Sequence, residues 1–445
     1  MTDRGARAAP APVADPILGT PHPGPVPGAV PLPDGACRFT VWAPARERVE
    51  VLLGDDRAVE LETGERGYHA LTVEHVPPGS RYRLRLDGER ELPDPASRSQ
   101  PEGVHGPSEV IDPAFPWSAA TWPNPPLAEH VLYELHVGTF TAEGTFGGAA
   151  ARLDDLVELG VTAIELMPIP PFPGGRGWGY DGVYPWAVHA DYGGLRGLQE
   201  LVDAAHRRGL AVFLDVVHNH LGPEGNYLAE YGPYFTDRYR TPWGAAVNFD
   251  GPGCDEVRRF FIGSALHLIE AARIDGLRLD AIHAIHDCSP LTFLEELTAR
   301  AHDAARRAGR RVHVVAENNS NDPRLVRPRE LGGYGMDGQW NDDFHHALIA
   351  LLTGERAGYY QSYGERTHLA RALRDGWVYT GQYSAFHRRR HGRPPERVEP
   401  RHLVVFSQNH DQIGNRLAGD RLGARTGFEA AKLAAALVVL SPYVP

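Results

Sequence analysis

The sequence predicts an α/β protein in which a (β/α)8 barrel of the TIM type follows a small N-terminal β-sandwich. From about residue 128, short apolar runs alternate with segments of helical spacing, the pattern of a parallel sheet covered by helices. Before that point, residues 34–112 hold short β-type runs separated by Gly, Pro and Asp. Such spacing is typical of an antiparallel sandwich.

Composition divides the chain into four parts. Residues 1–33 contain nine prolines and predict a disordered lead-in, because they offer little apolar surface to bury. Residues 34–112 form the predicted sandwich, with the runs CRFTVWAP, RVEVLL, YHALTVEHV and RYRLRLDG as its strands. Residues 113–127 are predicted as a linker, and residues 128–445 as the barrel.

Seven barrel strands are predicted from the apolar runs. They are 131–137, 161–168, 210–217, 274–282, 312–317, 335–340 and 402–408. Helices are predicted between them, including 255–273 and 291–308, and a last helix at 427–440. Only SPYVP follows that helix, so the eighth strand is expected to be missing and the barrel incomplete. An open barrel leaves an unpaired edge beside the seventh strand.

Charge and cysteine content exclude several classes of protein. The chain has 45 Lys and Arg against 57 Asp and Glu, a net charge of -12, which argues against nucleic acid as a partner. Its three cysteines, Cys37, Cys254 and Cys288, give no disulfide framework. No apolar run has the length of a signal peptide or a membrane span. We therefore expect a cytoplasmic protein without a membrane partner, of undetermined oligomeric state.

Polar side chains stand at the ends of four predicted strands. They are Asp215, Asn219 and His220 on the third, Arg278, Asp280 and His283 on the fourth, Glu317 on the fifth, and His410 and Asp411 on the seventh. Side chains alternate along a strand, so Arg278 and Asp280 share one face. Because the active groups of such barrels lie at the C-terminal ends of the strands, we expect Asp280, Glu317 and Asp411 to converge.

Converging carboxylates suit the hydrolysis of glycosidic bonds. One carboxylate attacks the anomeric carbon and another protonates the leaving oxygen. Arg278 is expected to keep Asp280 ionised, and partial burial is expected to keep the acid protonated. Structural interpretations exist for single residues, since an Asp at a strand end often caps a helix. A metal site is the rival functional interpretation, but no HExxH motif or cysteine supports it, and we predict no metal.

An aromatic stretch, GGRGWGYDGVYPW at 174–186, follows the second predicted strand. Its rings either fill the core of a long loop or stack on pyranose faces in a sugar cleft. Tyr180 is the candidate from this stretch. The glycines around it fit a loop that is shaped around a ligand.

The strings DVVHNH, GLRLDAIH, VVAEN and QNHD occur in that order along the chain. As a set they resemble the four short conserved regions of the α-amylase superfamily, glycoside hydrolase family 13. The resemblance implies that Asp280 is the nucleophile, Glu317 the general acid/base and Asp411 the transition-state stabiliser. It also implies substrate-binding roles for Tyr180, His220, Arg278, His283 and His410, and a supporting role for Asp215. Retention of configuration is implied, with nucleophile and acid about 5–5.5 Å apart.

Three longer strings, DVVHNHLGPEGNYL, LRLDAIHAIHD and FSQNHDQIGNR, are similar to the trehalose-releasing members of this superfamily, the maltooligosyltrehalose trehalohydrolases. That resemblance implies cleavage of the α-1,4 bond next to the terminal trehalose unit of maltooligosyltrehalose, and no cofactor. The segment 34–112 resembles the carbohydrate-module-like domain of branching and debranching enzymes. A branching or debranching enzyme, or an inactive glucan-binding fragment, remains an alternative at this point.

Overall fold

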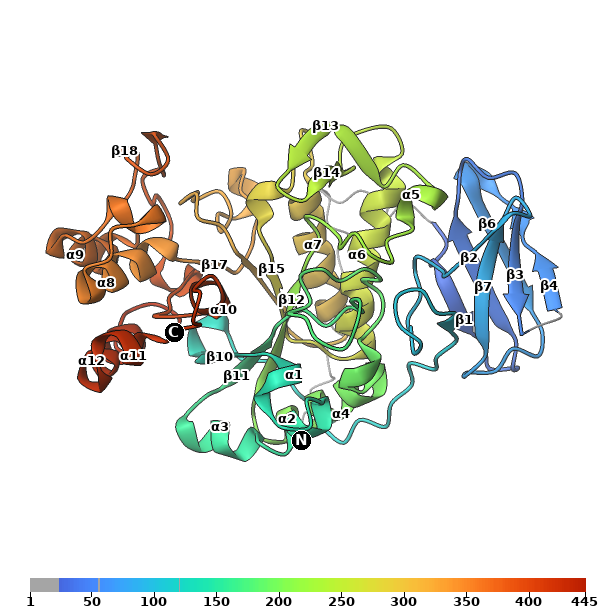
Figure 1. Ribbon diagram of the computed structural model, residues 1–445, viewed down its shortest axis with the longest axis horizontal. Coiled ribbons are helices and arrows are strands. Elements are labelled where there is room, and N and C mark those ends of the chain that lie inside the picture. The colour runs from blue at the N-terminus through green and yellow to red at the C-terminus, as the bar shows by residue number, and fades with distance from the viewer. Residues whose placement is uncertain (1–23, 55–56, 120) are drawn as a thin grey trace, which may run out of the picture.

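The computed structural model describes residues 24–54, 57–119 and 121–445. A β-sandwich lies at one end, a curled parallel sheet with its helices in the middle, and the C-terminal helices at the other end (Figure 1). The predicted fold class is confirmed in both parts.

The sandwich consists of two antiparallel sheets (Figure 1). One sheet has the order β1 (Gly28–Pro31), β2 (Cys37–Trp42), β6 (Tyr68–Val73) and β5 (Glu62–Thr63). The other has the order β4 (Arg57–Glu60), β3 (Val49–Leu53), β7 (Arg81–Leu86) and β8 (Arg90–Leu92), and β9 (Ser108–Glu109) also pairs with β7. β7 alternates half-buried and buried residues along RYRLRL, because only one face of an outer sheet covers the core.

The predicted lead-in through residue 33 is wrong at its end. Residues 28–31 form β1, which pairs with β2 in a four-residue register. Ala29 is buried in the sandwich core, so this short apolar segment gains both ladder hydrogen bonds and buried surface despite the surrounding prolines. The part of the lead-in before residue 24 lies outside the described residues.

Polar and aromatic contacts join the sandwich to the barrel. The Arg46 guanidinium donates to the backbone oxygen of Glu230 at 2.7 and 2.9 Å. The Tyr68 hydroxyl donates to the buried carboxylate of Glu256, and the ring of Trp42 packs edge-on against a barrel-side tyrosine at 5.3 Å. Because buried polar groups need such partners, the two domains form a specific interface.

The predicted linker packs beneath the barrel. Trp122 Nε1 donates to Asp275 Oδ1 at 2.9 Å, and Asn124 Nδ2 donates to the backbone oxygens of Asp275 and Arg311 at 2.9 and 3.0 Å. His206 Nε2 lies 2.7 Å from the other oxygen of Asp275. These bonds fix the segment at the N-terminal ends of the strands, the end opposite the titratable groups.

All seven predicted barrel strands are present and run parallel in chain order. They are β10 (Leu132–Leu135), β11 (Ala163–Leu166), β12 (Ala211–Val216), β15 (Gly276–Leu279), β16 (His313–Ala316), β17 (Gly338–Trp340) and β20 (Leu403–Val404). The last is much shorter than the predicted 402–408. After Val404 the ladder to β17 ends, although the ring of Phe406 still packs on Trp340 at 5.1 Å.

The eighth position is begun by the last residues of the chain, which the sequence did not predict. Val444 N–H donates to Leu403 O at 3.0 Å, and Val405 N–H donates to Val444 O at 2.8 Å. On the other side, Leu132 N–H donates to Pro445 O at 2.9 Å. Residues 443–445 therefore bridge β20 and the start of β10.

Helices surround the sheet, and those of the C-terminal part of the chain lie to one side of it (Figure 1). They are α1 (Val137–Phe140), α2 (Phe146–Ala150), α3 (Leu153–Leu159), α4 (Gly194–Arg207), α5 (Leu228–Tyr231), α6 (Cys254–Ala271), α7 (Phe293–Arg307), α8 (Asp342–Thr353), α9 (Arg366–Asp375), α10 (His410–Gly414), α11 (Leu422–Thr426) and α12 (Phe428–Val439). In α4 the predicted apolar face is buried at Leu195, Leu198 and Leu201, as 3.6-residue spacing requires. α7 begins with a capping box between Thr292 and Glu295, which satisfies free N–H groups of its first turn.

The barrel interior is a packed core. Its apolar members include Ala163, Ala211, Phe213, Val315 and Val444. At Gly276 a Cβ atom would stand 2.2 Å from the ring of Phe213, so the close approach of that ring requires glycine. This apolar core packs below the C-terminal ends of the strands, where the titratable groups lie.

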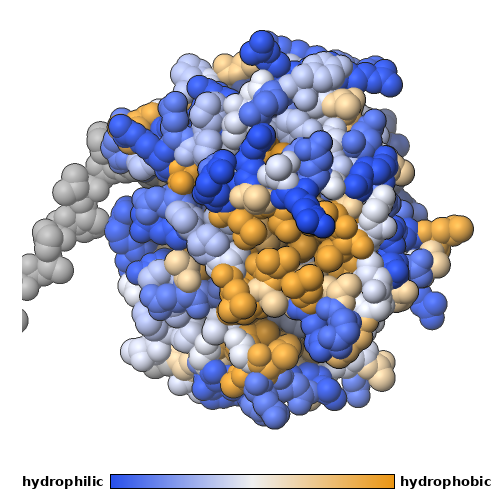
Figure 2. Space-filling model, turned by 90° about the vertical axis from the view of Figure 1, so that its left-hand side faces the viewer, coloured by the Kyte–Doolittle hydropathy of each residue, from blue (hydrophilic) through white to orange (hydrophobic). Residues whose placement is uncertain are grey.

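Apolar side chains remain exposed on the C-terminal helices. In and beside α12, Phe428, Leu433, Val439 and Leu440 are each more than half exposed. Figure 2 shows hydrophobic surface gathered on the face at which these helices lie in Figure 1. Among the described residues, no helix is both long enough and apolar enough to cross a membrane.

Candidate active site

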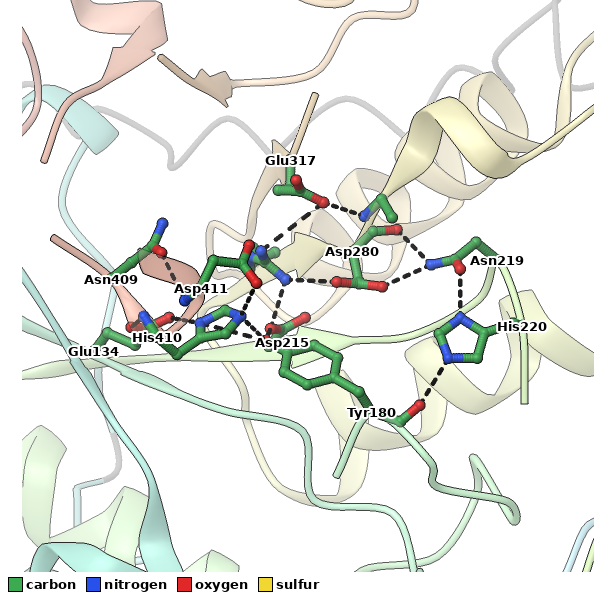
Figure 3. Close-up of polar contacts among 12 residues, drawn as sticks. Glu134, Tyr180, Asp215, Asn219, His220, Asp280, Glu317, Asn409, His410 and Asp411 are labelled. Carbon is green, nitrogen blue, oxygen red and sulfur yellow. Dashed lines mark hydrogen bonds and ion pairs between the residues drawn. The ribbon is translucent and has the colours of Figure 1, made fainter. Parts of the chain in front are cut away.

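Arg278 is fully buried and contacts three carboxyl groups of the polar cluster, Asp215, Asp280 and Glu317, which Figure 3 shows. In the register of β12 and β15 it stands beside Asp215, and its Nη1 lies 2.6 Å from Asp215 Oδ2 and 3.1 Å from Asp280 Oδ1. Its Nη2 lies 3.9 Å from Glu317 Oε2. The guanidinium also lies over the ring of Trp340, at 4.2 Å from the ring centre. The guanidinium of Arg278 therefore places one positive charge next to three carboxyl groups from neighbouring strands.

Asp280 follows β15 and is held from two sides. Arg278 contacts Oδ1, and Asn219 Nδ2 donates to Oδ2 at 2.7 Å and to the Asp280 backbone oxygen at 2.8 Å. The next residue, Ala281, has φ 40° and ψ 48°, a left-handed conformation that costs a non-glycine residue free energy. This turn lets the Ala281 N–H point at Glu317.

Glu317 follows β16 and is mostly buried. Burial raises its pKa to about 8, with the nearby Asp280 adding to the effect and Arg278 opposing it. Its Oε2 accepts the backbone N–H of Ala281. Glu317 is therefore protonated at neutral pH and can supply a proton, the property that a general acid needs.

Tyr180 and Asp215 form the floor next to Arg278. The Tyr180 hydroxyl donates to Asp215 Oδ2 at 2.6 Å, and burial raises the pKa of Asp215 to about 6, against the attraction of Arg278. Tyr180 also stacks on His410, with ring centres 5.0 Å apart. Elsewhere in the aromatic stretch, Tyr184 and Trp186 are buried, so for these two rings the core interpretation is the right one.

His410 and Asp411 lie at the start of α10 rather than directly at the end of a strand. Asn409 caps this short helix, with its side chain accepting the Asp411 N–H at 3.0 Å. His410 is buried, whereas the side chain of Asp411 is 48% exposed. His410 Nε2 lies 3.7 Å from Asp411 Oδ1, so the third carboxylate stands at the open side of the cluster.

Two further histidines predicted for the site lie around Asp280. His220 Nδ1 lies 2.5 Å from Asn219 Oδ1, and His220 Nε2 lies 2.8 Å from the backbone oxygen of Tyr180. Burial lowers the pKa of both His220 and His283, while the charge of Asp280 opposes this effect. Both nitrogens of the His220 ring thus face oxygen acceptors within the protein, and burial disfavours a charged ring at either histidine.

The cluster opens into a cleft of about 230 Å³ whose lining includes Glu317, Trp340 and Asp411. A second hollow, of about 640 Å³, is lined by rings that include Tyr180, Trp178 and Trp243. Trp243, at the turn between β13 (Phe235–Thr241) and β14 (Gly244–Val247), stacks on His220 at 4.2 Å. Exposed rings beside buried carboxyl groups form a surface that suits a sugar chain.

No arrangement typical of a metal centre is found among the described residues, where no group of three His, Cys, Asp or Glu side chains could hold an ion. His218, two residues before His220, packs against Phe261 and Phe293 instead. Burial lowers the pKa of His218 to about 4, which identifies it as a core residue.

Known proteins resemble the chain over almost its full length. Residues 27–113 match carbohydrate-binding module 48, the isoamylase N-terminal domain, and residues 93–242 match the α-amylase catalytic domain. A malto-oligosyltrehalose trehalohydrolase of Saccharolobus solfataricus is 48% identical over 93% of this chain and 73% of its own length. One from Arthrobacter ramosus is 47% identical over 92% of this chain and 72% of its own length. The chain belongs to the malto-oligosyltrehalose trehalohydrolase family.

A solved structure shares the fold of the chain. An α-amylase-like protein from Salmonella typhimurium superposes with a TM-score of 0.88 at 40% identity, over 94% of this chain and 72% of that one. As a trehalohydrolase-family member, the chain is a glycoside hydrolase of the α-amylase superfamily. The family resemblance read from the four short strings is thereby confirmed.

Three polar residues of this trehalohydrolase-family site carried no predicted role. Glu134 on β10 contacts His410, Asn219 holds Asp280, and Asp342 at the start of α8 lines the cleft. Burial and the neighbouring Asp411 raise the pKa of Asp342 to about 7. For Glu134 a signal was available in the sequence. It is a charged residue inside an apolar strand, VLYELHV, and such a residue is rarely buried without a partner.

Proposed function

We propose that the protein is a retaining glycoside hydrolase that cleaves the α-1,4 bond next to the terminal trehalose unit of maltooligosyltrehalose. The products are trehalose and a shortened maltooligosaccharide. Names of relatives that share 40–48% of the sequence support the substrate. The arrangement of Asp280, Glu317 and Asp411 around Arg278 supports the reaction type.

In the first step, an Asp280 carboxylate oxygen attacks the anomeric carbon on the glucan side of the bond. The bond from that carbon to the trehalose oxygen breaks, and Glu317 gives its proton to this oxygen, so trehalose leaves. The glucan is then esterified to Asp280. In the second step, Glu317 takes a proton from water and the water oxygen attacks the anomeric carbon. The bond from that carbon to the Asp280 oxygen breaks, which restores the Asp280 carboxylate, and the glucan leaves with its configuration retained.

The main support for this proposal is that Asp280 and Glu317, which lie beside the same arginine, have different surroundings. Asp280 accepts hydrogen bonds from Arg278 and Asn219, and such donors favour a carboxylate. Burial holds the pKa of Glu317 at about 8. A carboxylate next to a carboxylic acid is the pair that a retaining glycosidase requires.

The remaining residues are assigned to the sugar. Tyr180 supplies a stacking ring, and His220, His283 and His410 surround the sugar at the reacting bond. Arg278 orients Asp280, Asp215 supports Arg278, and Asp411 faces the positive charge that develops at the anomeric carbon. The exposure of Asp411 at the open side of the cluster supports its contact with substrate.

Trehalose release from maltooligosyltrehalose tests the proposal. We expect trehalose as a product, and the newly formed glucan end to appear first as the α-anomer in proton NMR. Asp280→Asn should lower kcat by more than about 10³-fold, as removal of a nucleophile does. Asp155→Asn, on the exposed side of α3, is the matched control.

Three results would contradict the proposal. Full activity of Asp280→Asn would exclude the assigned nucleophile. Absence of trehalose together with turnover of branched glucans would favour a branching or debranching enzyme, and glucan binding without any turnover would favour a binding protein.

A further inference from the structure

Glu134 is a carboxylate that the proposed reaction does not use, yet it lies at the reaction centre. It stands on the inner side of β10, and Figure 3 shows it directed at His410. Its Oε1 lies 2.6 Å from His410 Nδ1, and its Oε2 accepts the His410 backbone N–H at 2.9 Å. One side chain thus fixes both the ring and the backbone of the first residue of α10.

The hydrogen bonds of the cluster determine where the protons of His410 lie. An ionised Glu134 can only accept, so Nδ1 donates to it. The Tyr180 hydroxyl has one proton, which it donates to Asp215 Oδ2 at 2.6 Å. His410 Nε2, which lies 2.7 Å from the same hydroxyl oxygen, must therefore donate as well. Both ring nitrogens carry protons, and His410 is a cation.

We propose that Glu134 is a positioning residue that holds His410 as a cation with Nε2–H directed at the Tyr180 hydroxyl. This inference rests on the proposed function, because His410 and Tyr180 are assigned there to the sugar at the reacting bond. Glu134 itself does not touch substrate. It acts through the ring that it orients.

The charges around His410 agree with this protonation state. Burial disfavours a charged ring, but the hydrogen bond and charge of Glu134 outweigh it, so the pKa of His410 lies above its ordinary value. Arg278 opposes the positive charge, and Asp411 favours it. A carboxylate partner is what a histidine at this position needs to remain charged beside a buried guanidinium.

The protonated His410 ring is a charged hydrogen-bond donor to the Tyr180 hydroxyl. Hydrogen bonds from an ionised donor are shorter and about twice as strong as neutral ones. The bond from His410 keeps the Tyr180 hydroxyl proton directed at Asp215, which in turn contacts Arg278. Glu134 thereby stabilises one arrangement of the floor on which the sugar is bound.

Two substitutions separate charge from orientation. Glu134→Gln keeps an acceptor for the His410 backbone N–H but offers its amide to Nδ1, so the ring becomes neutral in nearly the same place. We expect kcat to fall about tenfold with little change in KM. Glu134→Ala removes both contacts and should lower kcat on the order of 10²-fold, as misplacement of reacting groups does.

Nitrogen NMR of the ring gives a readout that a merely structural role would not change. In protein labelled with ¹⁵N-histidine, the His410 signals are assigned by their loss in His410→Asn. In the wild type at neutral pH both ring nitrogens should show protonated shifts, and in Glu134→Gln Nδ1 should show the unprotonated shift. Glu129→Gln, an exposed residue just before β10, should change neither the spectrum nor the activity.

Unchanged kcat and unchanged His410 shifts in Glu134→Gln would overturn the inference. A neutral His410 ring in the wild type would overturn it too. The NMR measurement needs no turnover, so it remains decisive for Glu134 even if the wild type releases no trehalose, an outcome that would instead refute the proposed function.

Discussion

Replacing Glu317 by Gln should make the protein more stable while it removes activity. In the folded protein burial holds the pKa of Glu317 at about 8, against an ordinary value of 4.5. At neutral pH an unfolded chain would ionise this group and the folded protein does not, so the group opposes folding. Glutamine keeps the oxygen that accepts the Ala281 N–H and never ionises.

The size of the effect follows from the two pKa values. Stability changes by about 1.4 kcal/mol for each pH unit over which the unfolded group is ionised and the folded group is protonated. At pH 7 this gives Glu317→Gln a gain of about 3 kcal/mol, and at pH 5 a gain of about 0.7 kcal/mol. The gain should therefore grow as pH rises above 4.5 and become constant above 8.

Thermal unfolding of both proteins between pH 5 and pH 9 measures this difference. Glu158→Gln, which removes the same charge from the exposed side of α3, should shift Tm by a small and nearly constant amount. Trehalose release by Glu317→Gln should fall about 10²- to 10⁴-fold, the contribution of a general acid. A Tm difference between wild type and Glu317→Gln that does not change with pH would refute the protonated state of Glu317.

Asn219, Gly276 and Glu317 can each be tested by a further measurement. Asn219→Ala removes a hydrogen bond to the Asp280 carboxylate and should lower kcat about 10- to 100-fold, since bonds to charged groups contribute about 1.5–3 kcal/mol; unchanged steady-state kinetics would show that Asp280 does not depend on it. Gly276→Ala places a Cβ 2.2 Å from the Phe213 ring and should destabilise the barrel by about 1–3 kcal/mol; denaturant unfolding measures this, and an unchanged midpoint would mean that the ring moves freely. For the wild type, kcat/KM should fall as pH rises through about 8, because Glu317 then loses the proton that it supplies; a rate that is flat to pH 10 would contradict its role as the acid.

The order of the barrel strands could be predicted because each strand can be recognised from its own short apolar run. Runs such as 161–168 and 210–217 are apolar throughout, since both faces of a parallel strand are covered, and β11 and β12 lie within them. Predictions failed where the pattern was short or interrupted. β1 lies among prolines, and β20 ends at Val404 although apolar residues continue to Phe406.

Much of the candidate site could also be predicted, because alternation along a strand places Arg278 and Asp280 on one face. Contacts between distant parts of the chain were not predictable. The partner of His410 is Glu134, which is 276 residues away, and the contact depends on β20 and β10 meeting across the eighth position. Residues 443–445, which the sequence left unassigned, bridge these two strands.

The class of fold, the order of the strands and the kinds of side chain at their ends can all be derived from the sequence. Those features follow from local periodicity and from residue chemistry, and both can be seen in a linear chain. Which carboxyl group keeps its proton depends on contacts made in the folded protein, because the pKa of Glu317 is set by its burial and by the charges of Asp280 and Arg278 around it. The charge of His410 likewise depends on folding, since Glu134, the carboxylate that stabilises it, lies on the first barrel strand while His410 follows the last.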